Sequence, residues 1–109
     1  MAYDEILALR VRTLLDSEDF LVEKRMFGGY ALMLRGNMAC GVIKDELVVR
    51  VGPEAYDEAL GEPGARPFDF TGRPMRGWVA VSPDVISDDA ALRRWVRRGV
   101  GFVRELPGK

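Results

Sequence analysis

The sequence contains no histidine and only one cysteine, Cys40. Histidine is the usual general base and the commonest metal ligand, so its absence excludes Ser-His-Asp and Cys-His catalytic arrangements. One cysteine without histidine forms neither a structural zinc site nor an internal disulfide, which fits a reducing compartment. Cys40 lies in an apolar segment with no adjacent base, so we expect a buried core residue and not a nucleophile. Because phosphate loops of the Walker or Rossmann type are also missing, we expect no cofactor, no metal and no enzymatic activity.

Long apolar segments are missing as well. No run approaches the ~20 residues that a membrane span needs. Residues 1–5 lack the basic and apolar regions of a signal peptide, so we expect a cytoplasmic protein. The 109 residues, 48% hydrophobic and 30% charged, suit a chain with one modest core. Without repeats, low-complexity segments or linkers, we predict a single domain over residues 1–109.

Charge is balanced over the whole chain but unevenly distributed along it. The net charge is -1, so no global field attracts nucleic acid or an acidic membrane. All but three of the 16 basic residues are arginine. Residues 66–78 hold three arginines, and residues 93–104 hold five arginines and no acid. A GC-rich genome, whose codons favour arginine, accounts for the high total number of arginines. At particular positions, the alternative explanation is bidentate recognition of an anion by arginine.

Periodicity and turn residues predict an antiparallel meander between helices. Gly36-Asn37 indicates a type II′ hairpin turn and Lys44-Asp45 a second tight turn, and two-residue connections cannot join parallel strands. Residues 61–77 read as largely irregular because glycine and proline are dense there. The order α-β-β-β-β-α-β-β-α predicts an α+β two-layer sandwich, an antiparallel sheet with helices on one face. The predicted helices are 4–16, 53–60 and 88–105, with Ser87 or a neighbour capping the last, and the predicted strands are 22–27, 30–35, 38–43, 46–51, 68–70 and 78–81.

A short basic segment holds the first candidate contact residues, Lys24, Arg25 and Phe27. Strand alternation places Lys24 on one face and Arg25 with Phe27 on the other. An arginine on a half-buried face either pairs internally, with Glu23 or Asp69, or contacts an anionic group of a partner. We favour the internal pair.

A loop rich in glycine and proline presents Arg73 and Arg76 beside Trp78. Arginine next to an aromatic ring is common at interaction hot spots and can also stack on a nucleic-acid base. For Trp78 we favour a place in the core, and for the two arginines the structural and the functional interpretations stay open. The arginines of 93–104 can contact phosphate, but a solvated helix face is the better interpretation because no DNA-reading motif accompanies them.

Four further motifs stand out in the sequence: KRMFGG at 24–29, GNMA at 36–39, LVVRVG at 47–52 and GRPMRGW at 72–78. Together they resemble the signature of the TfoX/Sxy competence-regulator family, in its N-terminal domain. The similarity runs through residues 4–105 and implies an α+β fold of the kind shared by secretion chaperones and YjbR-like proteins. It also implies a link to transcriptional control, because full-length members support competence-gene activation together with the cyclic-AMP receptor protein. Those members carry a second, C-terminal domain without a counterpart in this sequence, and the family offers no catalytic residues.

We therefore predict a non-enzymatic protein-interaction module, an accessory factor in transcriptional regulation with an arginine-rich contact surface. The alternatives are a weak nucleic-acid-binding protein that uses the same arginines, and a small-anion binder or enzyme. A homodimer is compatible with the sequence, since a sheet edge in so small a domain can need cover. The candidate partner-binding residues are Lys24, Arg25, Phe27, Arg73, Arg76 and Trp78.

Overall fold

The computed structural model describes residues 3–26, 28–69, 72 and 74–107. The observed order confirms the predicted one and adds a short helix, α3, before the last. Among the described residues, no helix is long and apolar enough to cross a membrane. The elements are α1 (Glu5–Leu14), β1 (Leu21–Met26), β2 (Gly29–Leu34), β3 (Asn37–Ile43), β4 (Glu46–Arg50), α2 (Tyr56–Leu60), β5 (Ala65–Asp69), β6 (Pro74–Val81), α3 (Pro83–Ile86) and α4 (Asp89–Arg104).

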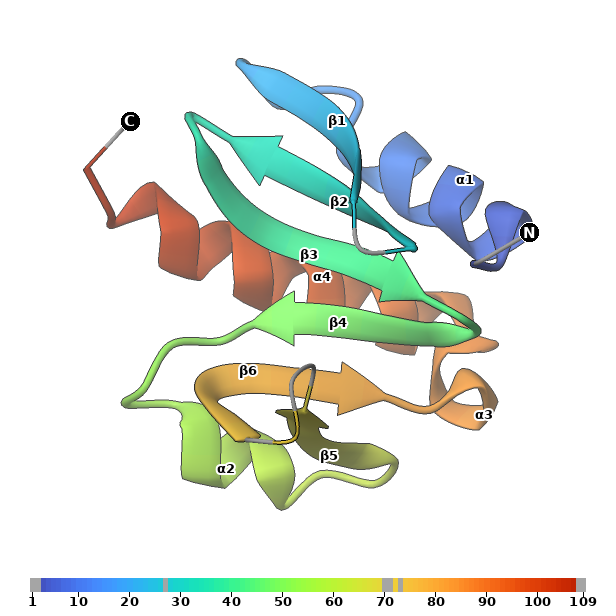
Figure 1. Cartoon of the computed structure of the whole chain (residues 1–109), viewed down its shortest axis with the longest axis vertical. Helices are drawn as coiled ribbons and strands as arrows, with labels where there is room; N and C mark the ends of the chain where they lie inside the picture. Colours follow the sequence, from blue (N-terminus) through green and yellow to red (C-terminus); the bar gives the residue numbers. More distant parts are fainter. Residues whose placement is uncertain (1–2, 27, 70–71, 73, 108–109) are drawn as a thin grey trace.

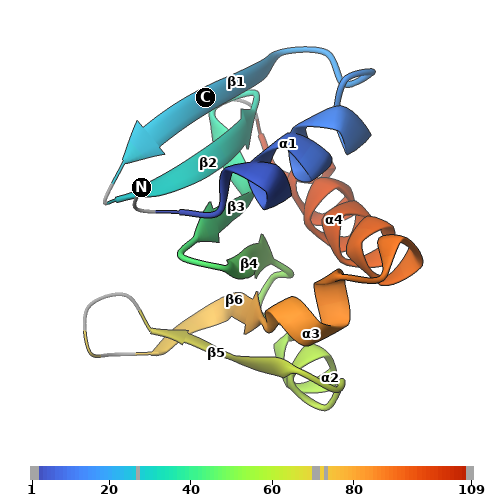
Figure 2. The ribbon, with the colours of Figure 1, turned by 90° about the vertical axis from the view of Figure 1, so that its right-hand side faces the viewer.

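The strands form one sheet in the order β1-β2-β3-β4-β6-β5, and every neighbouring pair is antiparallel. Helix α4 lies behind the sheet across β3 and β4 (Figure 1). Turned by 90°, the sheet is seen to curve, so that β1–β2 and β5–β6 flank a concave surface on the side away from α1 and α4 (Figure 2). We call this surface the open face, because no helix in the described part of the chain covers its centre.

The core fills the space between the sheet and α4. Alternate residues of the strands point to this side, among them Leu32, Val49 and Val79, which are all fully buried. From α4, Trp95 and Val96 complete the layer. Each such side chain contributes about 1.5–3 kcal/mol by leaving water. The side of α4 that faces the sheet is therefore apolar.

Caps and close packing set the position of α4. The helix begins after Asp88, whose carboxylate accepts a hydrogen bond from the amide of Ala91 at 2.9 Å. The cap is therefore the neighbour of Ser87, one of the two alternatives that the sequence left. Gly99 faces β3, and its missing side chain lets the helix backbone approach the carbonyl of Ala39.

Two sequence-based expectations about turns and strands were wrong. The β2–β3 turn is centred on Arg35 and Gly36, which have φ of 54° and 83°, while Leu34 and Asn37 pair across it. Positive φ at both central positions indicates a type I′ turn, one residue earlier than the predicted type II′ turn. The stretch 61–77 is also more regular than expected, because it contains β5 and the start of β6. Proline fits in β5 since this strand is at the sheet edge, where a missing N–H breaks no ladder.

Helix α2 is shorter than predicted. It begins at Tyr56, whereas the sequence indicated a start at Pro53. Residues 53–55 instead form a turn between β4 and the helix. Tyr56 and Ala59 are the buried residues of α2, so the helix rests on the β5–β6 end of the sheet by a single turn.

Candidate functional site

The open face contains a row of small residues that crosses all six strands. The strand register places Ala31, Gly41, Val48 and Ala80 side by side, with Lys24 at the β1 end and Arg66 at the β5 end. Ala31, Val48 and Ala80 are at most 2% exposed although no helix lies over them. Larger neighbours cover the row instead: a Cβ on Gly41 would lie 2.8 Å from Cε of Met38.

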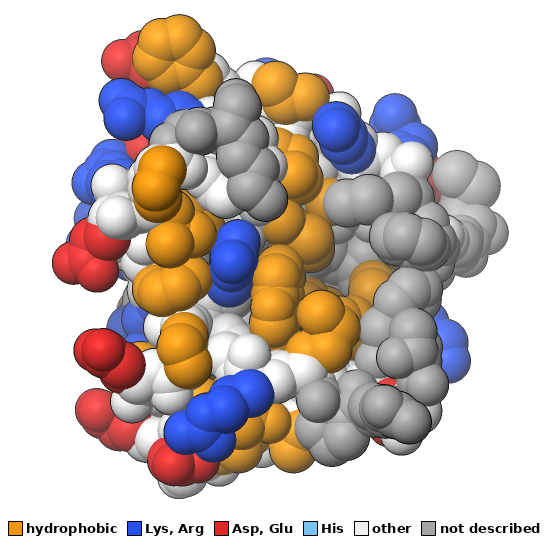
Figure 3. All heavy atoms as spheres, turned by 60° about the vertical axis from the view of Figure 1, so that its left-hand side comes forward, with side chains coloured by type: hydrophobic (Ala, Val, Ile, Leu, Met, Phe, Trp, Pro, Cys, Tyr) orange, Lys and Arg blue, Asp and Glu red, His pale blue; other side chains and the backbone are white. Residues whose placement is uncertain are grey.

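A layer of larger apolar side chains lies around this row. Met33, Met38, Ile43 and Trp78 are half-buried, and Val22 of β1 is 49% exposed. Figure 3, which brings the left side of Figure 1 forward, shows hydrophobic side chains gathered around a hollow that contains a basic side chain. An apolar surface of this kind, left open and bordered by cations, is typical of interaction sites.

Arg50 is the central cation of the open face. It pairs with Trp78 across β4 and β6, and its Cζ lies 5.3 Å from the centroid of that ring. The same Cζ lies 5.4 Å from the ring centroid of Phe102 in α4. Within the described ranges, Arg50 has no ion pair. Two rings therefore orient the guanidinium, and its N–H donors are left for an external acceptor.

Arg50 was not among the predicted site residues. The sequence offered one signal, its place as the charged residue in the LVVRVG segment, on a strand whose central residues 47–49 are buried. Neither ring that contacts it is near it in sequence, so the pattern alone did not assign it.

The sequence analysis placed Arg76 beside Trp78, but in the structure the two side chains contact different elements. The amides of Val51 and Gly52 both donate to the carbonyl of Gly77, at 2.8 and 3.0 Å, and Gly77 has a φ of 95°. This irregularity interrupts the strand alternation between the two side chains.

Arg76 lies against α2. Its Cζ is 5.3 Å from the ring centroid of Tyr56, and its Nη2 is 3.6 Å from Oδ2 of Asp57. Trp78 remains half-buried on the open face, so the expectation that it fills the main core was wrong.

Lys24 and Arg25 also separate, as strand alternation requires. Lys24 lies on the open face, and no ion pair to it occurs within the described part of the chain. Arg25 lies on the opposite side, where its Nε donates to the Tyr3 hydroxyl at 2.9 Å. The internal partner of Arg25 is thus a tyrosine, where the sequence suggested Glu23 or Asp69.

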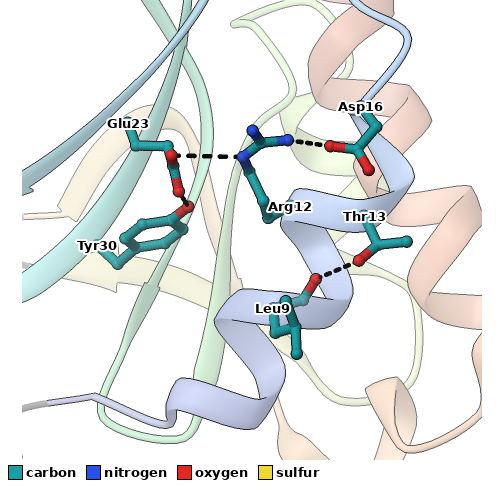
Figure 4. Close-up of polar contacts among 6 residues, drawn as sticks. All are labelled: Leu9, Arg12, Thr13, Asp16, Glu23 and Tyr30. Atoms are coloured by element: carbon teal, nitrogen blue, oxygen red, sulfur yellow. Dashed lines mark hydrogen bonds and ion pairs between the residues drawn. The ribbon is translucent and has the colours of Figure 1, made fainter.

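A polar network beside Arg25 ties α1 to β1 and β2 (Figure 4). The Tyr30 hydroxyl donates to the carboxylate of Glu23, and Arg12 contacts both Glu23 and Asp16. The hydrogen bond from Tyr30, together with Arg12, lowers the pKa of Glu23. Burial and the Glu23 carboxylate raise the pKa of Tyr30 above its usual range. These bonds give the network a structural role.

Two predicted contact residues, Phe27 and Arg73, lie outside the described residues. The structure therefore describes the surroundings of the other four candidates, which are Lys24, Arg25, Arg76 and Trp78.

The arginine face of α4 is partly neutralised by acids from other elements. Arg94 and Arg98 both bind Glu62, and Arg104 binds Glu18 with an N–O distance of 2.7 Å. Arg93 and Arg97 are exposed and form no ion pair within the described ranges. The interpretation as a solvated helix face, which the sequence favoured, therefore applies to Arg93 and Arg97.

The chemistry of Cys40 agrees with its expected place in the core. The side chain is 0% exposed, and burial raises the pKa of its thiol to about 12, so it stays protonated. Among the described residues, no group of three or more cysteine, aspartate or glutamate side chains could hold a metal ion.

Comparison with known proteins identifies the family. The model of the TfoX N-terminal domain matches residues 13–103, from α1 to the end of α4, and includes Lys24, Arg50 and Trp78. Comparisons with curated proteins and with solved structures gave no significant match. The matched family is one of competence-related regulatory domains and is not a known enzyme family. The chain therefore belongs to the TfoX N-terminal domain family.

Proposed function

We propose that this domain is a non-enzymatic protein-interaction module, an accessory factor in transcriptional regulation, and that it binds a protein partner with its open face. The observation that carries the proposal is Arg50, whose guanidinium contacts two aromatic rings and has no ion pair within the described residues. These contacts remove rotamer freedom from the side chain before a partner arrives, so less entropy is lost on binding. Arginine beside tryptophan is also the composition that dominates interaction hot spots.

The surroundings of Arg50 support the same conclusion. Met33, Met38 and Ile43 supply apolar contact area, and Lys24 adds a second cation on the same face. Apolar centres with few, well-placed charges are characteristic of protein interfaces. The membership of the chain in a regulatory family supports a role in transcriptional control.

The proposal is tested by capture from native lysate with the purified domain, with and without nuclease. The test variant is the double substitution Lys24→Gln/Arg50→Gln, and its matched control is Arg93→Gln/Arg97→Gln, which removes two unpaired cations from α4. Circular dichroism and thermal melting check that both variants are folded.

We expect wild type and the α4 control to capture the same protein regardless of nuclease, and the open-face variant to lose it. Equal capture by a folded open-face variant would contradict the proposal. Capture that nuclease abolishes would favour the nucleic-acid alternative, and loss in the α4 control alone would place that contact on α4.

A further inference from the structure

The dimensions of the open face define what can lie on it. The small-residue row spans five inter-strand steps of the six-stranded sheet, which at about 4.8 Å each gives roughly 24 Å. By register, Val22, Met33, Met38 and Trp78 flank one side of the row, and Ile43 flanks the other. Positions two residues before and after the row on one strand are about 13 Å apart. An α-helix with its side chains is about 10–12 Å wide, and about 16 residues cover roughly 24 Å. A helix of about four turns thus matches both dimensions.

The flanking side chains suit an apolar helical stripe. Met33 and Met38 lie on adjacent strands and pair directly. Methionine is unbranched and polarisable, and so it adapts to different apolar surfaces, as in other helix-binding grooves. Trp78 and Ile43 add larger apolar area on either side of the row.

The charge of the open face specifies the charge of the segment that binds it. Lys24 at one end of the row and Arg50 beside its centre lack ion pairs within the described ranges, while Arg66 at the other end binds Glu46 through both carboxylate oxygens. Asp69 also interacts electrostatically with Arg66. Among the described residues of this face, the three cations still outnumber the two acids, Glu46 and Asp69, so the face carries a small positive excess. Complementary charge on a partner speeds association and fixes its orientation.

A second copy of the chain does not satisfy these requirements. Two open faces brought together would place like charges opposite each other. Helix α1 does expose Ile6 and Leu9, at 75% and 66%, but it lies on the other side of the sheet (Figure 2). Docking it on the open face of a neighbour would give a head-to-tail contact, which builds rings or filaments and not a two-fold dimer.

We infer that the open face binds an acidic, amphipathic α-helix of about four turns from a protein partner, lying along the small-residue row. This inference rests on the proposed function and names the class of segment that is recognised. The helix would place its apolar stripe on Met33, Met38 and Trp78 and its carboxylates near Lys24 and Arg50.

The test is an NMR titration of the ¹⁵N-labelled domain with synthetic peptides of about 16 residues. The first is a stapled helix of leucine and glutamate with one leucine face, and the second has the same composition with the leucines dispersed. In the third, lysine replaces glutamate. A short DNA duplex is the fourth probe.

We expect saturable binding of the first peptide only, with the largest shifts at the amides of Ala31, Gly41, Val48 and Ala80. Arg50→Gln should weaken this binding about tenfold, the ratio expected for one lost hydrogen-bonded charge, whereas Arg97→Gln should leave it within about twofold. Lys24→Glu, which removes no packing contact, should also weaken it and gives a second reading if Arg50→Gln fails to fold.

Other results overturn the inference in distinguishable ways. Equal binding of the dispersed peptide, or shifts confined to α4, would refute helix recognition at this face and would leave the lysate result standing. Binding of DNA alone would replace the protein partner by nucleic acid. If no probe binds and the open-face variant also captures as wild type does, both the inference and the proposed function fail.

Discussion

Two glycines in α4, only two positions apart, should respond oppositely to alanine. At Gly99 a Cβ would fall well inside van der Waals contact with the carbonyl oxygen of Ala39, and 3.3 Å from Cγ1 of Val49. Overpacking costs about 1–3 kcal/mol, and a rigid backbone neighbour favours the upper half of that range. Alanine regains about 1 kcal/mol of helix propensity, so Gly99→Ala should destabilise the domain by about 1–2 kcal/mol. At Gly101 nothing lies within 4 Å, and Gly101→Ala should stabilise by about 0.5–1 kcal/mol.

Urea unfolding followed by circular dichroism measures both variants on the same scale. For a domain of this size, 1 kcal/mol corresponds to about 4–8 °C in Tm, so the expected difference of about 1.5–3 kcal/mol between the two variants corresponds to roughly 6–24 °C. Because the helix and its propensity are shared, the difference between the variants isolates the packing cost of α4 against β3. A Gly99→Ala protein as stable as wild type would refute the close approach of the two elements.

Three further predictions concern single side chains. Cys40 should react with a thiol reagent far more slowly in the native protein than in urea, since its pKa is raised to about 12 by burial, and rapid native labelling would contradict its placement. Asp88→Ala should cost about 0.5–2 kcal/mol in urea unfolding by removing the α4 cap, whereas no change would mean that the cap contributes nothing. For Glu23, the folded pKa is lowered, so its stabilising effect is present above the ordinary carboxylate pKa and is lost as pH falls through the folded value. The difference in unfolding free energy between wild type and Glu23→Gln should therefore shrink on acidification from about pH 6 to pH 3, and a constant difference would contradict the network.

Local patterns predicted the elements well, because each tight connection and each apolar stripe lies within one segment. The exact position of the β2–β3 turn was not predictable, since strand alternation allowed either Arg35-Gly36 or Gly36-Asn37 as the two central residues. Asn37 is buried and donates to the carbonyl of Pro107 at 3.0 Å, a contact from the far end of the chain. That long-range bond gives Asn37 a place in β3 and leaves Arg35 and Gly36 for the turn.

The candidate site was predicted only in part, and the reason is again separation along the chain. Alternation correctly placed Lys24 and Arg25 on opposite faces of one strand. It could not show that Arg50 meets rings from β6 and α4, or that the irregularity at Gly77 turns Arg76 toward α2. Such contacts depend on how the sheet curves, which no single segment specifies.

In the described part of the chain, the meander β1–β4 and the β5–β6 hairpin pair as strands at the border between β4 and β6. It consists of four residue pairs, from Leu47 with Val81 to Arg50 with Trp78. Opening this border would part Arg50 from Trp78 without disturbing the hydrogen bonds of either half. A ligand that contacts both residues therefore stabilises the closed form by mass action. Amide hydrogen exchange along these four pairs should slow in proportion to ligand occupancy. The exchange rate at the β4–β6 border would therefore report how much ligand is bound.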